Sequence, residues 1–103
     1  MHGMKDGYVY IMSNQPNGTL YTGVTADVVR RVYEHKAGVG SSFVRRYGLT
    51  KLVYFEVHTE IGLAIQRETN IKYWPRAWKV RLLEGMNPNW EDLYPDLIGG
   101  SSC

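Results

Sequence analysis

Residues 8–24, YVYIMSNQPNGTLYTGV, decide the fold of this 103-residue chain. Residues 8–12 are aromatic, β-branched or long and apolar, which predicts a strand, and residues 20–24 resume that character. Residues 13–19 between them are dense in Ser, Asn, Pro and Gly, the residues that form turns. The stretch therefore predicts a β-hairpin with a long loop.

A helix is predicted directly after the hairpin. Apolar side chains recur at helical spacing over residues 28–36, and Thr25 offers an N-cap ahead of Asp27 in the first turn. The helix should end near Gly38, where a flexible glycine-rich break begins. Residues 43–47 are then expected to form a short helical turn.

The next segments predict one more strand and a second helix. Residues 51–57, KLVYFEV, form a mixed apolar run, which favours a central strand. Thr59 offers an N-cap for a helix whose apolar face is interrupted by one acid, Glu68. The positions predicted on that face are Ile61, Ala64, Ile65, Glu68 and Ile71.

A last long helix is predicted to open at Pro75 and to stop at Gly85. Its predicted core-facing residues are Ala77, Trp78, Val80, Leu82 and Leu83. Residues 87–90 then form a turn that is expected to run into a short helix through Leu93. The order β-β-α-β-α-α predicts an α/β (α+β) fold in which helices cover a small sheet.

Length and composition support a single globular domain over residues 1–103, with an ordered core at about 7–95 and frayed ends. No apolar run approaches the roughly 20 residues of a membrane-spanning helix, and the amino terminus lacks the apolar core of a secretory signal. We therefore expect a cytoplasmic protein. One cysteine, Cys103, excludes a disulfide framework and a multi-cysteine zinc site and is expected to be an unremarkable thiol.

The formal net charge of +2 conceals an uneven distribution. Residues 30–51 and 67–81 hold eleven of the twelve Lys and Arg residues but only two of the ten acids, Glu34 and Glu68. If these segments meet in the fold, they form a basic face suited to a polyanion, of which nucleic acid is the commonest. The alternative is two solvated helix faces.

Glu68 is a candidate metal ligand because burying a lone carboxylate costs several kcal/mol unless it is paired or binds a metal. One carboxylate can hold a hard cation such as Mg²⁺, whose shell is completed by waters and by phosphate oxygens of the substrate. An ion pair with Lys72, four residues on, is the alternative.

Arg31 and His35 lie one helical turn apart and can brace a phosphate and position a water. The alternative is a solvated arginine and a histidine at the rim of the core. Tyr8 and Tyr10 share one side of their strand, and strand tyrosines are most often core residues with a hydrated hydroxyl.

Gly23 allows close backbone approach where the second strand meets the first helix. Neither a GxGxxG nor a Walker pattern accompanies it, so no nucleotide cradle is predicted. No serine stands in a G-x-S-x-G setting, which excludes that kind of hydrolase.

Five features of the chain are correlated in order and spacing, namely Tyr8-Val9-Tyr10, Tyr21-Thr22-Gly23, Arg31, His35 and Glu68. Together they resemble the GIY-YIG nuclease family, and the likeness spans nearly the whole chain. It is nearest to the small stand-alone bacterial members, through LYTGVT, RRVYEHK, RETNIKYWPRAWK and NPNWEDLY, and extends to the catalytic module of a bacterial excinuclease. The resemblance implies a three-stranded, mainly antiparallel sheet flanked by helices, with a one-metal phosphodiesterase site on the sheet surface.

The resemblance also implies a role for each site residue. Tyr10 and Tyr21 are the motif tyrosines, one of which, or a water it holds, deprotonates the attacking water. Arg31 would stabilise charge on the phosphate, His35 would assist the nucleophile or the proton path, and Glu68 would hold one Mg²⁺ or Mn²⁺ ion. A tyrosine near its usual pKa of about 10 is a poor base at neutral pH, so a metal or an arginine would have to lower that pKa.

The chain departs from the family pattern at several positions. Tyr8 stands where the motif has glycine, and Thr22 replaces its isoleucine, neither of which removes a functional group. Val24 stands where some members carry a lysine, which removes one phosphate contact. The asparagine that follows the catalytic helix in many members has no clear counterpart, and Asn87 and Asn89 are the available amides.

These observations predict a divalent-metal-dependent endonuclease that acts on DNA rather than RNA. A chain this short has little with which to read a long sequence, so we expect it to select unusual DNA structure, as in repair. The alternatives are a non-catalytic nucleic-acid-binding module and a protein-interaction domain. The predicted nucleic-acid contacts are Arg30, Lys36, Arg45, Arg46, Lys72, Arg76 and Lys79.

Overall fold

The computed structural model describes residues 6–100, so the prediction for Cys103 falls outside the described residues. Strands β1 (Gly7–Ser13) and β2 (Leu20–Thr25) form the predicted hairpin and pair antiparallel, with Tyr10 opposite Gly23. Strand β3 (Lys51–His58) pairs antiparallel with the other edge of β1. The sheet order is therefore β2-β1-β3, which confirms the three-stranded antiparallel sheet.

The prediction that β3 is central is wrong, since β1 occupies that place. The apolar run in β3 that suggested a central strand results from a β-bulge opposite Ile11 and Met12. Met12 pairs with Leu52 and Ile11 pairs with Tyr54, which leaves Val53 as the extra residue on β3. Leu52 packs on one face of the sheet, whereas Val53 and Tyr54 pack on the other, so three consecutive residues are buried on an edge strand.

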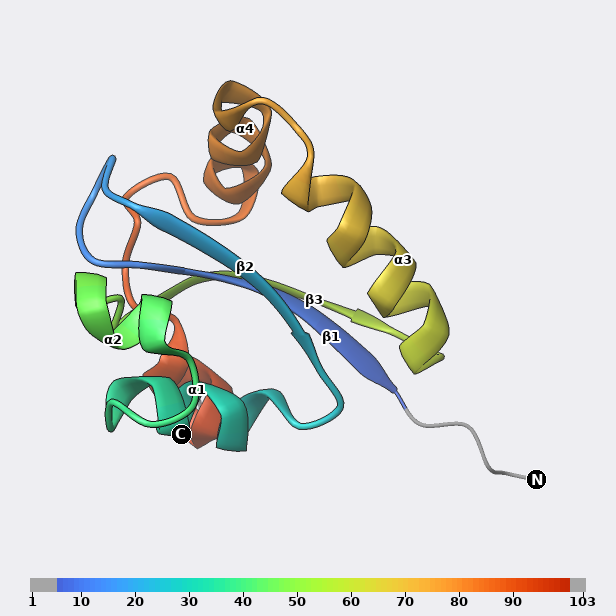
Figure 1. Cartoon of the computed structure of the whole chain (residues 1–103), viewed down its shortest axis with the longest axis horizontal. Coiled ribbons are helices and arrows are strands. Elements are labelled where there is room, and N and C mark those ends of the chain that lie inside the picture. The colour runs from blue at the N-terminus through green and yellow to red at the C-terminus, as the bar shows by residue number, and fades with distance from the viewer. Residues whose placement is uncertain (1–5, 101–103) are drawn as a thin grey trace.

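Helices cover both faces of the sheet (Figure 1). On the face of Tyr10 and Met12 lie α1 (Val28–Lys36), α2 (Ser42–Tyr47) and the C-terminal segment that ends in η1 (Asp96–Gly100). On the opposite face lie α3 (Ile61–Lys72) and α4 (Arg76–Met86), which pack on the side chains of alternate residues of β1. The basic segments of α1 and α2 therefore lie on helices that cover one face of the sheet, and those of α3 and α4 lie on helices that cover the other.

Both predicted N-caps are one or two residues too early. Helix α1 is capped by Asp27, whose carboxylate accepts a hydrogen bond from the backbone N–H of Arg30 at 3.1 Å. Thr25 instead accepts from the N–H of Asp27, which closes the turn that leads into the helix. Glu60, rather than Thr59, precedes α3, and its side chain makes no capping hydrogen bond to that helix.

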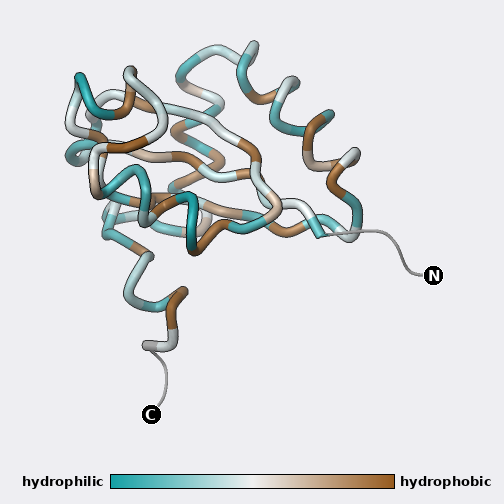
Figure 2. The backbone as a smooth tube through the Cα atoms, turned by 60° about the horizontal axis from the view of Figure 1, so that its bottom comes forward, coloured by the Kyte–Doolittle hydropathy of each residue, from teal (hydrophilic) through white to brown (hydrophobic). Residues whose placement is uncertain are grey.

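The face predictions for α3 and α4 are only partly correct. Ala64, Glu68 and Ile71 are buried, but Ile65 is 49% exposed. On α4 only Leu83 is fully buried, and Ala77 and Trp78 are exposed because the helix meets the core through its later residues around Leu83. In Figure 2 hydrophobic and hydrophilic residues alternate along α3, as expected for a helix with one covered face.

The ends of α4 also differ from the prediction. Pro75 is the N-cap rather than the first helical residue, and the helix continues past Gly85 to Met86. Residues 87–90 form the predicted turn, but no helix follows through Leu93. Trp90 stays in the turn with a positive φ of 57°, because its buried indole N–H donates to the Glu84 carboxylate at 2.7 Å.

An ion pair between Lys36 and Asp92 fastens the C-terminal segment to α1. The Asp92 carboxylate also accepts from the backbone N–H groups of Leu52 and Tyr94, each at 3.1 Å. These contacts hold the segment against the start of β3. No helix within residues 6–100 has both the length and the apolarity needed to cross a membrane.

Candidate active site over the edge strand

A buried hydrogen bond joins the central strand to the first helix. The Tyr10 hydroxyl lies 2.8 Å from Nε2 of His35, and both residues are at most 1% exposed. Burial lowers the pKa of His35, and the charge of Arg31 adds to this effect, so the imidazole is neutral at pH 7. His35 is thus a core residue that faces the site, rather than a histidine at the rim.

The Tyr10 side chain lies across the backbone of β2, and Gly23 makes this possible. A Cβ atom built on Gly23 would lie 2.4 Å from the Tyr10 hydroxyl oxygen, so any larger residue would displace the ring. Burial raises the pKa of Tyr10 to about 12, with the nearby Tyr21 and Glu68 acting in the same direction and Arg31 opposing them. Tyr10 therefore stays protonated at neutral pH, contrary to the lowered pKa that a base requires.

Tyr21 is the motif tyrosine that reaches the surface. Its ring packs against both Tyr10 and His35, with centroid distances of 6.4 and 5.6 Å, and it remains partly exposed. The two motif tyrosines thus differ in environment, because the Tyr10 hydroxyl is enclosed and Tyr21 borders solvent. Geometry therefore separates two residues that the sequence left equivalent.

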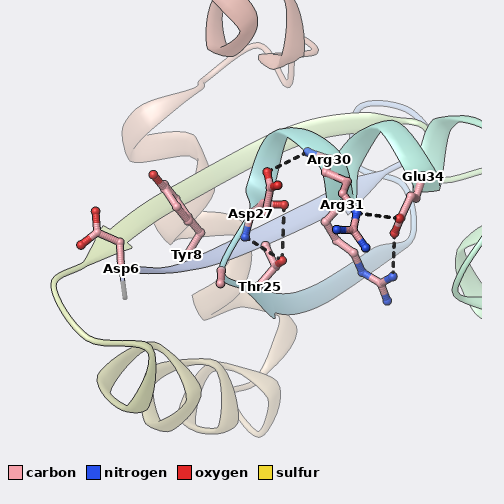
Figure 3. A pocket seen from close by; sticks show the side chains of 8 residues that line it. Asp6, Tyr8, Thr25, Asp27, Arg30, Arg31 and Glu34 are labelled. Atoms are coloured by element: carbon pink, nitrogen blue, oxygen red, sulfur yellow. Dashed lines mark hydrogen bonds and ion pairs between the residues drawn. The ribbon is translucent and has the colours of Figure 1, made fainter. Parts of the chain in front are cut away.

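Arg31 stands beside this cluster in an ion pair with Glu34. Its Nη1 lies 3.1 Å from Glu34 Oε1, while Nε of Arg30 lies 3.2 Å from Oε2 of the same carboxylate. The two guanidinium groups hold the pKa of Glu34 below its usual value. Figure 3 shows these side chains along an open cleft of about 890 Å³, which Tyr8 also lines.

Glu68 forms the ion pair with Lys72 that the sequence offered as the alternative to a metal ligand. It is buried on the inner face of α3, and its Oε2 lies 3.0 Å from Nζ of Lys72. The charge of Glu68 contributes to the raised pKa of Tyr10. The pKa of Lys72 is raised chiefly by Glu68, with a smaller contribution from Tyr21. Helix α3, which carries this pair, packs against β1 and β2, the strands of the two motif tyrosines.

The donor set fits one hard divalent cation. Among residues 6–100 no three His, Cys, Asp or Glu side chains gather into a metal-binding group, so Glu68 would be the single protein ligand. Mg²⁺ and Mn²⁺ accept such a site because waters and phosphate oxygens complete their shell. The Lys72 ammonium group pairs with this carboxylate in the structure, and a bound divalent cation would replace it.

The seven predicted nucleic-acid contacts fall into two groups. Lys36 is held by Asp92 and the Thr50 carbonyl, Lys72 by Glu68, and Lys79 by the Lys72 carbonyl. Arg76 donates to the Asn17 and Gly18 carbonyls, which fastens the hairpin loop. Arg45 and Arg46 are exposed, and Arg30 is exposed although it pairs with Glu34; all three lie on α1 or α2, the helices that cover the face of Tyr10.

Asn87 is not available as a site residue. Its amide donates to the Val53 and Glu91 carbonyls and accepts from the Glu91 N–H, so all of its polar groups serve the turn after α4. The family asparagine therefore has no counterpart at this position.

Sequence reasoning missed Glu34 and the pair Phe43 and Tyr47. Glu34 was counted only as a charge that opposes the basic segment, although its place three residues after Arg31 indicates an ion pair. Phe43 and Tyr47 are four residues apart on α2, and this spacing was the available signal that they lie side by side.

Comparisons with known proteins agree with this geometry. The sequence profile described as "GIY-YIG catalytic domain" matches residues 6–81. A UPF0213 protein of Natronomonas pharaonis is 45% identical over 78 residues, which cover 76% of this chain and 91% of that protein. A UPF0213 protein of Haloquadratum walsbyi is 43% identical over 77 residues, covering 75% and 85%.

A solved structure supports the same assignment. The solution NMR structure of a UPF0213 protein from Bacillus halodurans matches with a TM-score of 0.53 and 30% identity, covering 87% of this chain and 95% of that one. The fold of the chain is thus that of a known group. The chain belongs to the GIY-YIG nuclease family, among the small UPF0213 proteins.

Proposed function

We propose that the protein is an endonuclease that hydrolyses phosphodiester bonds of DNA with one Mg²⁺ or Mn²⁺ ion. The observation that carries this proposal is the placement of Glu68, a buried carboxylate on the helix that packs against β1 and β2, the strands of the two motif tyrosines. A buried carboxylate is costly for the fold unless a cation pairs with it; Lys72 supplies that charge at 3.0 Å, and a bound Mg²⁺ or Mn²⁺ ion would replace it.

Tyr21 is proposed to face the attacking water, because it borders solvent next to His35. In the reaction a water oxygen forms a bond to phosphorus, the ester P–O bond breaks, and the proton of the water leaves by way of the Tyr21 hydroxyl. The leaving oxygen takes a proton from solvent. Tyr10 and His35 are positioning residues in this scheme, since both are enclosed and neutral at pH 7.

Arg31 is proposed to bind the scissile phosphate. Its guanidinium lies beside the tyrosine cluster and opposes the rise in the pKa of Tyr10, so it is close enough to act on the same group. A substrate phosphate would replace the Glu34 carboxylate as its anionic partner. When bound at Glu68, the cation would supply Lewis-acid polarisation of the phosphoryl group.

DNA selected by structure, in the cytoplasm and in the service of repair, is the substrate class that we propose. Support comes from the exposed arginines Arg30, Arg45 and Arg46 on the face of the site. Such side chains contact phosphates without reading base sequence. Cleavage of an RNA with the same structure is the comparison that tests the preference for DNA.

The test is cleavage of supercoiled plasmid with Mg²⁺ or Mn²⁺ by wild type, Glu68→Gln and Glu60→Gln. Glu60 is the matched control, since it is an exposed carboxylate at the start of the same helix. We expect Glu68→Gln to lose cleavage and retain DNA binding and a folded circular-dichroism spectrum, while Glu60→Gln cleaves as wild type does. Equal rates for all three proteins would contradict the proposal. DNA binding by all three without cleavage would instead support the non-catalytic module.

A further inference from the structure

We infer that α2 carries a stacking surface for an unpaired base of the nucleic-acid substrate, next to the residues proposed for catalysis. The surface consists of Phe43 and Tyr47. This inference rests on the proposed function and narrows its substrate class to strands that contain unpaired nucleotides.

An unbroken series of aromatic rings leads from the site to this surface. Tyr10 lies 6.4 Å from Tyr21, Tyr21 lies 6.0 Å from Phe43, and Phe43 lies 4.8 Å from Tyr47, all between ring centroids. The series begins in the core at Tyr10 and reaches the outer side of α2 at Tyr47. A base stacked on Phe43 or Tyr47 would therefore belong to a nucleotide close to the phosphate at Tyr21.

The two outer rings are not needed by the core. Phe43 is 42% exposed and Tyr47 is 46% exposed, whereas Val44 between them is the residue through which α2 packs on the sheet. The two rings lie in contact, with centroids 4.8 Å apart, so they form one contiguous exposed apolar patch rather than two scattered residues. A contiguous patch of this kind suits contact with another molecule.

The surroundings of the rings favour a nucleotide as that partner. Phe43 and Tyr47 line a cleft of about 370 Å³ together with Ser42, Arg45 and Arg46, and none of the described residues that line it is acidic. The Arg46 guanidinium lies 6.0 Å from the Tyr47 ring centroid. Proteins that bind single-stranded nucleic acid combine aromatic rings, which stack on bases, with basic side chains, which contact phosphates.

Unpaired bases suit this surface better than a duplex does. In a double helix each base is covered by its neighbours, so its face is available only where the strand is gapped, branched or frayed. The stacking surface would thus direct cleavage to such places without reading sequence.

The test measures DNA affinity without metal, in the Glu68→Gln background, so that cleavage plays no part. Fluorescence anisotropy would compare a labelled oligo(dT) with a blunt duplex of equal length for the added changes Phe43→Leu, Tyr47→Leu and both together. Leucine keeps apolar bulk and removes the aromatic face. Tyr33→Leu is the matched control, because Tyr33 is an exposed tyrosine outside the cleft, and Tyr47→Phe retains the ring.

We expect the double change to weaken binding of oligo(dT) about tenfold or more and binding of the duplex less than about twofold. Tyr33→Leu and Tyr47→Phe should leave both affinities unchanged. An equal loss on both DNAs, or no loss, would overturn the inference. It would also fail if the double change converted a dimer into a monomer and left DNA affinity intact, since the surface would then bind a second copy.

The inference and the proposed function can fail separately. Plasmid cleavage by wild type, with no effect of the two leucine changes on oligo(dT), would remove the stacking surface and leave the nuclease. Loss of oligo(dT) affinity in a protein that cleaves nothing would remove the nuclease and leave the surface.

Discussion

The Tyr10 hydroxyl and Nε2 of His35 form a 2.8 Å hydrogen bond that is enclosed by the sheet and α1. The bond joins the central strand to the helix that also carries Arg31. Because both partners are buried, neither can exchange its contact for water when the other is removed. This relationship makes the first motif tyrosine a part of the core.

Tyr10→Phe should therefore destabilise the fold, whereas Tyr21→Phe should not. Removing the Tyr10 hydroxyl leaves His35 Nε2 buried without a partner, which costs about 1–3 kcal/mol. Tyr21 is partly exposed, so the same change there should cost no more than about 0.5 kcal/mol. Urea denaturation monitored by circular dichroism gives both values. Equal costs would show that the buried hydrogen bond does not distinguish the two positions.

His35 should make the fold sensitive to mild acid. Burial lowers its pKa in the folded protein from the ordinary value of 6.5, so the unfolded chain binds more protons as the pH falls below that value. The contribution of neutral His35 to the free energy of unfolding is present above about pH 6.5. It is lost as the pH falls toward the pKa of His35 in the folded protein.

The measurement compares wild type with His35→Gln at several values from pH 7.5 to pH 5. The other ionisable groups are the same in both proteins, so their effects cancel in the difference. We expect the free energy of unfolding to decrease more steeply toward acid for wild type. Parallel curves for the two proteins would contradict the assignment of a depressed pKa to His35.

Local sequence patterns predicted where the strands and helices lie better than they predicted how these elements pack on one another. The hairpin over residues 8–24 was found because strand and turn residues stand side by side in the sequence. The place of β3 was missed because a bulge around Val53 buries consecutive residues, an effect that depends on the register with β1. Exposed Ile65 and Trp78 were assigned to the core because periodicity cannot show how wide a covered helix face is.

The candidate site shows the same division. The types and spacing of its residues could be predicted from the sequence. The difference in burial between Tyr10 and Tyr21 could not, because it depends on which of the two rings packs against Gly23 and is covered by neighbouring side chains. The cations Lys36 and Arg76 were predicted to bind nucleic acid from charge alone. The structure shows each of them held by backbone carbonyls of distant segments, contacts that only the folded chain creates.

Glu34→Gln should strengthen substrate binding. The Glu34 carboxylate engages Arg31 at 3.1 Å and so competes with the phosphate for its guanidinium. Its removal should lower KM on a short DNA substrate with little change in kcat, because the competition affects binding. Asp27→Asn is a control from the same cleft, since Asp27 caps α1 through its side chain and asparagine also serves as an N-cap. A raised KM for Glu34→Gln would indicate that this carboxylate positions Arg31 productively.

Arg45 and Arg76 should differ in the salt dependence of DNA binding. Arg45 is exposed beside the stacking surface, so Arg45→Ala should weaken binding and reduce the slope of log K against log salt by about one. Arg76 donates to the Asn17 and Gly18 carbonyls, so Arg76→Ala should leave the slope unchanged and lower the melting temperature. Anisotropy titrations at several salt concentrations would measure both slopes. An equal reduction by the two changes would place Arg76 on the DNA as well.

Lys72→Met should make the stability of the protein depend on divalent cations. Without Lys72, the buried Glu68 carboxylate loses the ammonium group that lies 3.0 Å away, and an unpaired buried charge is strongly unfavourable. Mg²⁺ or Mn²⁺ at Glu68 would replace it, so the melting temperature of Lys72→Met should fall in EDTA and recover when the cation is added. The double change Lys72→Met with Glu68→Gln is the control, because it removes the carboxylate and should show no such recovery. A melting temperature of Lys72→Met that is the same in EDTA and in Mn²⁺ would argue that Glu68 is not the ligand.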